Sequence, residues 1–519
     1  MKLYRGFATV GGMTVISRLL GFVRDILIAA VLGASAISDA FFVALRVPNM
    51  FRRIFAEGAF NAAFIPLYTK KLHEAGEDTA RVYAGHALAG LTAILIAVVV
   101  LAEIAAPWLV MLLAPGFSED QDKFRLTVLL VRIAMPYLVF MSWVALYTGL
   151  LNTLGKFAAA AFAPSILNFV LIAVLLGLIA TGNGADQLAG VAMAWGVAVS
   201  GLLQVGIVIF AAARTGLRLK LERPQWTPDM KRLVHLAIPG VIAGGVAQIA
   251  IVIATVVASL EDRVVSWLYY ADRIFQLPLG LIGVAVGVVL LPDISHKLRS
   301  GDREAVSESE NRAMEFSLFM TVPAAVALFF CAQPIIRVLF ERGAFMATDA
   351  SASATMLAML SFGLPAYVVV KVLQPSFFAR EDTKTPMLNS GLALIGNAIL
   401  SPTLFFMVGP PGIALATSIV GWINVVLLAF ALRKRGEFTL DDALRRAFRG
   451  IVIASAAMGL GLWLLARVLR PYFDPAYGLL IQFAALTALI GVGVVLYFGI
   501  GAATGAVKPR TFVKDLLGR

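Results

Sequence analysis

Apolar residues fall in long blocks along this chain, separated by short polar segments. Windows such as Ala87–Ala102 and Ile238–Ala258 carry no charged residue over a length comparable to a bilayer. A helix needs about 20 apolar residues to cross the hydrocarbon layer, so each such block predicts a transmembrane helix. The blocks are too long for the strands of an outer-membrane barrel, and they lack the alternating period of about ten residues.

The pattern predicts fourteen helical spans and therefore an all-α polytopic membrane protein. The predicted spans cover residues 7–32, 38–69, 83–105, 124–151, 160–180, 188–213, 234–258, 265–292, 314–332, 352–377, 387–408, 413–432, 450–468 and 477–500. Because fourteen is an even number, both termini are expected on the same side of the membrane.

The distribution of basic residues predicts which side that is. Of the 43 lysines and arginines, about 28 lie in the tails and in one set of alternate loops, and only seven lie in the opposite loops. The positive-inside rule therefore predicts an inner-membrane protein with both termini in the cytoplasm. The same topology explains the net charge of +12, so we do not interpret that charge as a nucleic-acid surface.

Composition agrees with a membrane protein. The chain is 60% hydrophobic and only 14% charged, with a mean hydropathy of +0.88, whereas soluble domains carry about 25% charged residues. The single cysteine, Cys331, cannot form an internal disulfide and is expected to pack as a small hydrophobic residue. No cleavable signal peptide is expected, because the first apolar segment contains Arg18, Arg24 and Asp25.

A weak internal repeat relates the two halves of the chain. The segment from Asp39 to Leu72 resembles the segment from Ser266 to Leu298, with Arg46 opposite Arg273 and Pro66 opposite Pro292. Similar composition alone could produce some likeness, but matched charges and prolines favour a true repeat. The offset equals six spans, so we expect two pseudo-symmetric six-helix lobes around a central site, as in many transporters. The predicted parts are an N-lobe (1–220), a C-lobe (221–440), and a C-terminal helix pair with its tail (441–519).

Eight basic residues lie inside predicted spans: Arg18, Arg24, Arg46, Arg52, Arg53, Arg132, Arg273 and Lys371. Each costs roughly 2.5–3.5 kcal/mol at a helix centre on insertion scales. Such groups should face a water-filled cavity or pair with acids.

Helical geometry suggests which of them can pair. At 100° per residue, one stripe of the second span contains Asp39, Arg46, Arg53 and Glu57, with Asn61 beside it. Arg53 and Glu57 are four residues apart and can form an ion pair, whereas Arg52 points about 100° away. In the first span Arg18 and Asp25 share a face and Arg24 lies off it.

Basic residues thus outnumber the acids, and we expect unpaired guanidinium groups at Arg24, Arg52 and Arg273. A cavity with surplus arginine suits a polyanion, because the planar guanidinium donates two parallel hydrogen bonds to phosphate. The alternative is that the arginines only hold helices together by ion pairs. Both interpretations stay open for Arg46, Arg53, Arg132 and Lys371.

Signals of an enzyme are absent from the sequence. The four histidines are scattered without metal-ligand spacing, and there is no Walker A motif or Ser-His-Asp arrangement. The acidic segment Pro115–Phe124 is interpreted as a solvated outer turn. We therefore expect no catalysis, no metal and no cofactor.

Several long motifs resemble those of a known family. They are "SRLLGFVRD" (Ser17–Asp25), "DAFFVALRVPNMFRRIFAEGAFNAAFIP" (Asp39–Pro66), "APGF" (Ala114–Phe117), "SWLYYADRIFQLPLGLIGVA" (Ser266–Ala285), "LLPDIS" (Leu290–Ser295) and "VKVLQPSFFAREDTKTP" (Val370–Pro386). Together they are similar to the MurJ/MviN lipid II flippases of the multidrug/oligosaccharidyl-lipid/polysaccharide exporter superfamily. The resemblance covers essentially the whole chain.

The resemblance implies fourteen helices, two six-helix lobes, and a groove for the lipid tail formed by the last helix pair. It implies transport of lipid II, the lipid-linked peptidoglycan precursor, by alternating access, with the cavity arginines of the family at Arg18, Arg24, Arg52 and Arg273. The residues and the resemblance together give substrate-binding candidates Arg18, Arg24, Arg52, Arg53 and Arg273. The supporting candidates are Ser17, Asp25, Asp39, Arg46, Asn49, Glu57, Asn61, Ser266, Asp272 and Lys371.

The expected partners are lipid II and membrane lipids, with peptidoglycan synthases as further candidates; the chain is expected to be a monomer that binds no nucleic acid. Two other functions stay open. A drug/cation antiporter of the same superfamily would want a cavity rich in acids and aromatic rings rather than arginine. A non-transporting scaffold for cell-wall synthases would leave the arginines in the spans without a role.

Overall fold

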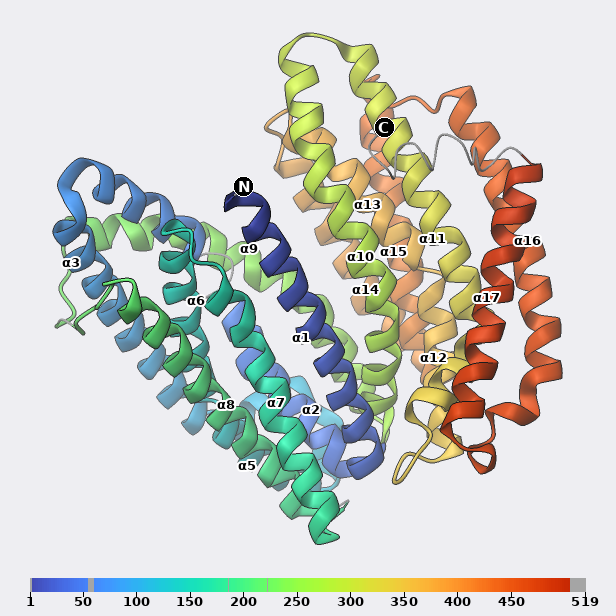
Figure 1. Ribbon diagram of the computed structural model, residues 1–519, viewed down its shortest axis with the longest axis horizontal. Coiled ribbons are helices and arrows are strands. Elements are labelled where there is room, and N and C mark those ends of the chain that lie inside the picture. The colour runs from blue at the N-terminus through green and yellow to red at the C-terminus, as the bar shows by residue number, and fades with distance from the viewer. Residues whose placement is uncertain (1, 55–59, 185, 222, 505–519) are drawn as a thin grey trace. The chain divides into compact units, whose positions relative to one another are not determined.

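The structure is a computed structural model that describes residues 2–54, 60–184, 186–221 and 223–504 (Figure 1). All regular elements in these ranges are helices. The chain divides into two compact units. Unit 1 comprises Met1–Ser266 with Gly343–Phe345, and unit 2 comprises Trp267–Arg342 with Met346–Arg519.

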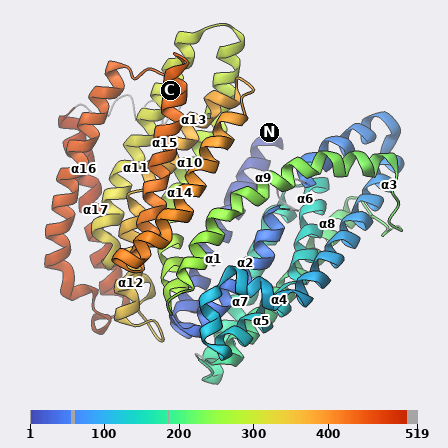
Figure 2. The ribbon, with the colours of Figure 1, turned by 180° about the vertical axis from the view of Figure 1, so that it is seen from behind.

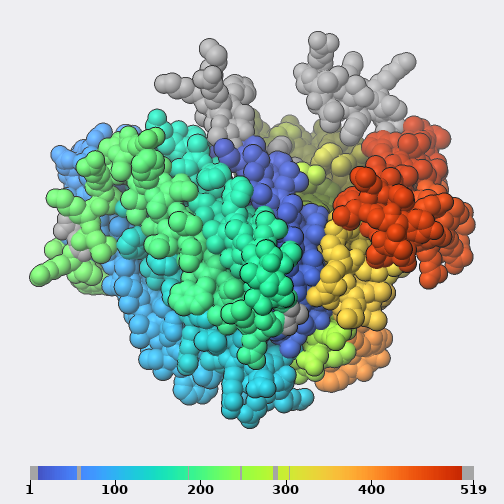
Figure 3. All heavy atoms as spheres, turned by 60° about the horizontal axis from the view of Figure 1, so that its bottom comes forward, coloured from blue at the N-terminus to red at the C-terminus, as the bar shows by residue number. Residues whose placement is uncertain are grey.

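Unit 1 is a bundle of long helices with one short helix and a 3₁₀ turn. Its elements are α1 (Lys2–Leu32), α2 (Ala36–Arg52), α3 (Asn61–Ile104), α4 (Ala106–Leu113), η2 (Pro115–Glu119), α5 (Gln121–Ala134), α6 (Tyr137–Thr153), α7 (Ala158–Thr181), α8 (Gln187–Arg214) and α9 (Pro228–Ala258). Helix α7 packs between α1 and α8, α2 packs on α5, and α9 packs on α3 (Figures 1 and 2). The space-filling view shows the atoms of α7 and α8 in close contact (Figure 3).

Unit 2 contains the remaining helices. They are α10 (Val264–Arg299), whose first residues belong to unit 1, then α11 (Arg303–Phe340), α12 (Ala347–Ser361), α13 (Leu364–Phe378), α14 (Lys384–Val408), α15 (Pro411–Lys434), α16 (Asp442–Leu469), η3 (Arg470–Phe473), η4 (Pro475–Tyr477) and α17 (Leu479–Ala503). Helix α11 is central, because it packs on α12, α13, α16 and α17.

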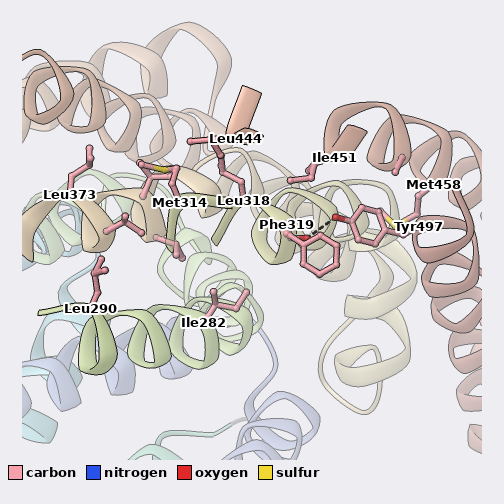
Figure 4. Close-up of a cluster of buried hydrophobic side chains, with 14 of the residues drawn as sticks. Ile282, Leu290, Met314, Leu318, Phe319, Leu373, Leu444, Ile451, Met458 and Tyr497 are labelled. Atoms are coloured by element: carbon pink, nitrogen blue, oxygen red, sulfur yellow. Dashed lines mark hydrogen bonds between the residues drawn. The ribbon is translucent and has the colours of Figure 1, made fainter. Parts of the chain in front are cut away.

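A continuous apolar cluster fixes the last two helices to the rest of unit 2. The cluster includes Met314 and Leu318 of α11 and Leu444, Ile451 and Met458 of α16 (Figure 4). The hydroxyl of Tyr497 in α17 donates a hydrogen bond of 2.8 Å to the backbone carbonyl of Phe319 in α11. The C-terminal pair is therefore packed against α11 by burial and by a specific polar contact.

Ten helical segments in the described residues are long and apolar enough to cross a membrane. They lie at Asn61–Ile104, Gln121–Thr153, Ala158–Thr181, Gln187–Arg214, Glu304–Phe340, Ala347–Phe378, Lys384–Val408, Pro411–Lys434, Asp442–Phe473 and Leu479–Ala503. Among the helices outside this set, α1, α2 and α10 carry most of the basic residues singled out in the sequence.

Two predicted spans are each broken once. The predicted span 124–151 is divided into α5 and α6 at Met135–Pro136, and 352–377 is divided into α12 and α13 at Phe362–Gly363. Proline lacks the N–H that a helix interior needs, and Pro365 likewise starts α13. The two breaks lie 227 residues apart, the same separation as Arg46 and Arg273, so they follow the sequence repeat.

The predicted second span is not one regular α-helix, and this expectation is wrong. Helix α2 ends at Arg52, the backbone at Arg53 and Ile54 is π-helical, and α3 begins at Asn61. A π turn bonds i to i+5, so later side chains no longer follow steps of 100°. Helix α3 in turn continues through the polar segment after residue 69, with a non-helical Gly76 (φ 81°) marking the kink.

Candidate functional site

Asp39, at the start of α2, is a fully bonded acid of unit 1. Its side chain is fully buried. One carboxylate oxygen accepts from the backbone N–H and the hydroxyl of Ser266 (3.0 and 2.6 Å), and the other accepts from the Arg263 N–H (2.9 Å) and the Lys123 ammonium (2.9 Å). Four donors satisfy this carboxylate, which explains how it can be buried.

Local sequence positions this carboxylate. Ser35 is the N-cap of α2 and forms a capping box with Ser38, so the first turn of the helix is fixed. The Ser38 hydroxyl also lies 2.8 Å from the hydroxyl of Ser266. Two of the supporting candidates, Asp39 and Ser266, are therefore brought together through the start of α2 and the start of α10.

Lys123 completes this network, and the sequence did not reveal it. The side chain is 1% exposed, bridges Asp39 and Asp262, and lies 4.1 Å from the centroid of the Phe117 ring. The interpretation of residues 115–124 as a solvated turn is thus wrong for Lys123 and for Phe117, which is 1% exposed. A lysine among several acids gives no sequence signal of burial, because its partner Asp39 is 84 residues away.

Arg24 lies in a second buried network, between α1 and α7. Its Nε and Nη2 atoms donate to Asp25 (3.0 and 2.7 Å) and its Nη1 donates to the side chain of Asn168 (2.9 Å). Asn168 donates in turn to the backbone carbonyl of Ser17 (3.0 Å). The expectation of an unpaired guanidinium at Arg24 is therefore wrong, since Asp25 pairs with Arg24 rather than with Arg18.

Asn168 was not predicted to have a role, although its position in an apolar helix was informative. It is a lone amide in the apolar run of α7, and it is 6% exposed. An amide in such a place needs a polar partner, because burying it unbonded is costly. The partner could not be identified from spacing, since it comes from another helix.

Arg18 and Arg53 differ from Arg24 in their surroundings. Both side chains are exposed, and neither has an ion pair or a side-chain hydrogen bond within the described ranges. Arg46 is different, because its Nη1 donates to the hydroxyl of Thr255 in α9. Arg46 therefore contributes to helix packing in unit 1.

The end of α2 carries the remaining candidates of unit 1. Arg52 donates to the side-chain oxygen of Asn49 (3.3 Å), and Asn49 donates to the carbonyl of Leu45 (2.9 Å). The side-chain oxygen of Asn61 is buried without a partner in the part of the chain that the structure describes. Glu57, and hence its predicted ion pair with Arg53, lies outside the described residues.

In unit 2, the candidate residues lie on α10 and α13. Arg273 is half-buried on α10, and the neighbouring Asp272 accepts a hydrogen bond of 2.6 Å from Gln276. The half-buried Lys371 of α13 packs over Gly283 of α10, where a Cβ would lie 2.8 Å from the lysine nitrogen. Glycine at 283 is thus what leaves room for this lysine.

The polar chemistry of these groups is that of binding and not of catalysis. Within the residues described, no group of three or more His, Cys, Asp or Glu side chains is placed to hold a metal ion. The available groups are guanidinium donors on helices of a membrane protein, which suit an anionic ligand. The buried carboxylate of Asp39 is already satisfied by its own neighbours.

Comparisons with known proteins agree with this description. A relative named "Probable lipid II flippase MurJ" from Rhizobium tropici is 43% identical over 518 residues, covering 99% of this chain and 97% of its own length. A relative of the same name from Vibrio cholerae is 34% identical over 512 residues, covering 96% of this chain and 95% of its own length.

Solved structures are similar to this chain as well. The structure titled "Lipid II flippase MurJ, inward closed conformation" matches with a TM-score of 0.77 and 28% identity, over 98% of this chain and 99% of that one. An inward-facing multidrug resistance MATE transporter matches with a TM-score of 0.65 at 13% identity, over 85% of this chain and 99% of that one, which shows a shared fold alone. The family model described as "Lipid II flippase MurJ" matches residues 28–483, so the chain belongs to this family.

Proposed function

We propose that this chain is a flippase that moves lipid II, the lipid-linked precursor of peptidoglycan, from the cytoplasmic to the periplasmic leaflet of the inner membrane. Its family membership is the observation that carries the proposal, since relatives named for this activity match almost the full length of the chain. The family is one of transporters, and its members are named for moving a lipid rather than for a chemical reaction.

The chemistry of the substrate explains what the protein must supply. A diphosphate and a polar headgroup cannot enter hydrocarbon unaided, because each charge would lose its hydration. Arginines in a wet cavity replace that hydration with bidentate hydrogen bonds. We infer that Arg18 and Arg53 contact the diphosphate, together with Arg52 and Arg273.

Arg24 has a different role in this proposal. Its three donor atoms are directed at Asp25 and Asn168, so it positions α1 against α7. The half-buried Lys371 is a further cation that a polyanion could meet.

The proposed topology has fourteen spans with both termini in the cytoplasm. Ten spans follow from length and apolarity. Helices α1, α9 and α10, and α2 counted together with the first part of α3, supply the other four. The excess of lysine and arginine in alternate loops supports the orientation. We expect two six-helix lobes, residues 1–220 and 221–440, and a C-terminal part, residues 441–519.

Alternating access in this proposal is a rocking of the two lobes around the cavity, while the lipid tail stays in the membrane beside α16 and α17. The repeat supports it, because its two halves share a helix break and a basic residue at the same offset. The exposed apolar side chains of α17, such as Leu480 (88%) and Val495 (71%), are compatible with contact to lipid.

Complementation with single variants tests the proposal. In cells depleted of their own flippase, Arg18→Ala and Arg53→Ala should leave lipid II in the cytoplasmic leaflet, measured as its accessibility to a membrane-impermeant probe from outside. A charge-assisted hydrogen bond is worth about 1.5–3 kcal/mol, so transport should fall by at least about tenfold. Arg→Lys at either position should restore part of the activity, because lysine keeps the charge but not the fork.

Arg467→Ala is the matched control. This arginine is in α16, where it stacks over Trp463 at 3.7 Å, and it has no part in the proposed cavity. Wild-type transport in the Arg18→Ala and Arg53→Ala variants, at equal protein levels, would contradict the proposed binding role. A chain that supports growth without moving lipid II would instead be a scaffold.

A further inference from the structure

The segment from Arg435 to Asp441, which joins α15 to α16, is held by polar contacts from two sides. Asn311 of α11 is 1% exposed; it donates to the carbonyl of Thr439 (2.9 Å) and accepts from the N–H of Asp441 (3.2 Å). From the turn after α13, Asp382 pairs with Arg435 at 2.8 Å. We call this segment the 435–441 loop.

Glu310 precedes Asn311 on α11 and is the most deeply buried acid in this region, with 1% of its surface exposed. One of its oxygens accepts a hydrogen bond of 2.5 Å from the hydroxyl of Ser376 in α13. Its other oxygen, Oε2, is buried and has no hydrogen-bond partner in the described part of the chain. An ionised carboxylate with one unbonded oxygen in such a place is costly.

Glu437 of the 435–441 loop has the same deficiency. Its Oε1 lies 3.3 Å from Nε of Arg380, but its Oε2 is buried and has no partner among the described residues. Arg380 also donates to the backbone carbonyl of Ser376 (2.6 Å), the residue whose hydroxyl bonds Glu310, and both Glu437 and Arg380 act on Glu310 electrostatically. One arginine therefore serves two carboxylates that repel each other.

Three further cations of unit 2 are engaged with other acids. On α10, Lys297 binds Asp293 (2.9 Å), and both contact Ser309, the residue before Glu310. Arg312 of α11 pairs with Glu315 and with Asp441 of the loop, and Arg435 pairs with Asp382. Within the described residues, none of these three cations contacts Glu310 or Glu437.

We propose that Glu310 and Glu437 bind one proton between them, which makes this end of unit 2 a proton-binding site. A single proton satisfies both unbonded oxygens, because the protonated carboxyl donates through its O–H and the other carboxylate accepts. It also leaves one negative charge, which matches the one positive charge of Arg380. Two carboxylates that share a site behave in this way, and the proton belongs to the pair.

The site links protonation to the position of the 435–441 loop and hence to the start of α16. With the proton bound, Glu437 is drawn toward α11, beside the contacts that Asn311 makes. Without it, the two carboxylates repel and the loop is held less tightly. This inference does not depend on which substrate the chain transports.

Infrared spectroscopy of the purified full-length protein in lipid nanodiscs tests the proposal. At neutral pH, the wild type should show the carbonyl band of one protonated carboxylic acid, which shifts in D₂O. The band should be lost in Glu310→Gln and equally in Glu437→Gln, and the double variant should lose no more. Glu308→Gln is the matched control, because Glu308 is exposed on the same helix two residues away.

Hydrogen exchange of the 435–441 loop gives a second readout. Amide protection in the loop should fall in the wild type as the pH is raised, and it should be independent of pH in Glu310→Gln, whose amide donates as the protonated acid does. A band that persists in both glutamine variants overturns the proposal. A band lost in only one of the two variants also overturns the proposal, because it would place the proton on a single residue. A band that disappears when Na⁺ is added at constant pH overturns it as well.

Discussion

Replacing Asp39 by asparagine is the sharpest test of how unit 1 is held together. Lys123 contacts two carboxylates at nearly the same distance, Asp39 at 2.9 Å and Asp262 at 2.8 Å. Their environments differ completely, because the Asp39 side chain is fully buried and the Asp262 side chain is 79% exposed. One lysine thus offers a buried ion pair and a surface ion pair in the same molecule.

The expected magnitudes follow from that difference. Asp39→Asn removes the buried counter-charge of Lys123, and the amide has only one acceptor atom for four donors. Breaking a buried pair from one side costs about 3–5 kcal/mol, and each donor left unbonded adds to this. We therefore expect Asp39→Asn to destabilise the protein by about 4 kcal/mol, roughly a thousandfold in the unfolding constant. Asp262→Asn should cost less than about 1 kcal/mol.

The assay is reversible unfolding of the purified protein in mixed detergent micelles, with increasing SDS, followed by circular dichroism. A double-mutant cycle adds Lys123→Met, which should be about as harmful as Asp39→Asn. The combined Asp39→Asn/Lys123→Met variant should then be less destabilised than the sum of the two. Equal effects of Asp39→Asn and Asp262→Asn, or additive effects in the cycle, would refute the argument that burial makes this pair strong.

Three further predictions concern other contacts. Tyr497→Phe removes the hydroxyl that fixes α17 to α11 and should lower the free energy of unfolding by about 0.5–1.5 kcal/mol in the same assay. Hydrogen bonds from the N–H and hydroxyl of Thr385, with a nearby arginine, hold the pKa of Asp382 below its ordinary value. The stability that ionised Asp382 contributes is fully present above the ordinary aspartate pKa, and it is lost as the pH falls through the lowered pKa of the folded protein. Asp382→Asn should therefore flatten the decline in thermal stability below about pH 4. Gly343→Ala should destabilise unit 1 by several kcal/mol, because φ is +58° and a Cβ would lie 2.2 Å from a backbone oxygen. Gly409→Ala should cost only about 1–2 kcal/mol, because φ is +78° but the space around the Cβ is open. Thermal unfolding of the two variants compares these costs.

Ten apolar spans of the described residues could be predicted from the sequence, because the bilayer imposes a length on each apolar block. The breaks inside them were harder to predict. Pro136 lies at the point where one helix ends. In contrast, Pro48, Pro164 and Pro402 lie inside helices that continue past them. Whether a proline ends a helix depends on which neighbours accept the freed backbone groups, and those neighbours are tertiary.

The pairing of the candidate site residues could not be predicted from spacing along one helix. Periodicity places side chains around one helix axis, so it assigned Asp25 to Arg18, seven residues away. In the structure, Asp25 pairs with its own neighbour Arg24, because Asn168 of another helix holds the guanidinium between them. Consecutive residues of a helix do not ordinarily face each other. A contact from outside the helix overrode that rule, and no spacing within α1 could have shown it.

The arginines of the predicted spans therefore divide by what they contact, not by where they fall in the sequence. Arg24 donates to Asp25 of its own helix and to Asn168 of α7, and Arg46 donates to Thr255 of α9, so substitutions there should lower stability together with transport. Arg18 and Arg53 have exposed side chains, so substitutions there should lower transport and leave stability unchanged. A binding site for a polyanion needs both kinds, since an exposed guanidinium can bind a diphosphate only if the helix that carries it is fixed. The buried pairs fix the helices, and the exposed guanidinium groups are the ones that an anionic substrate can contact.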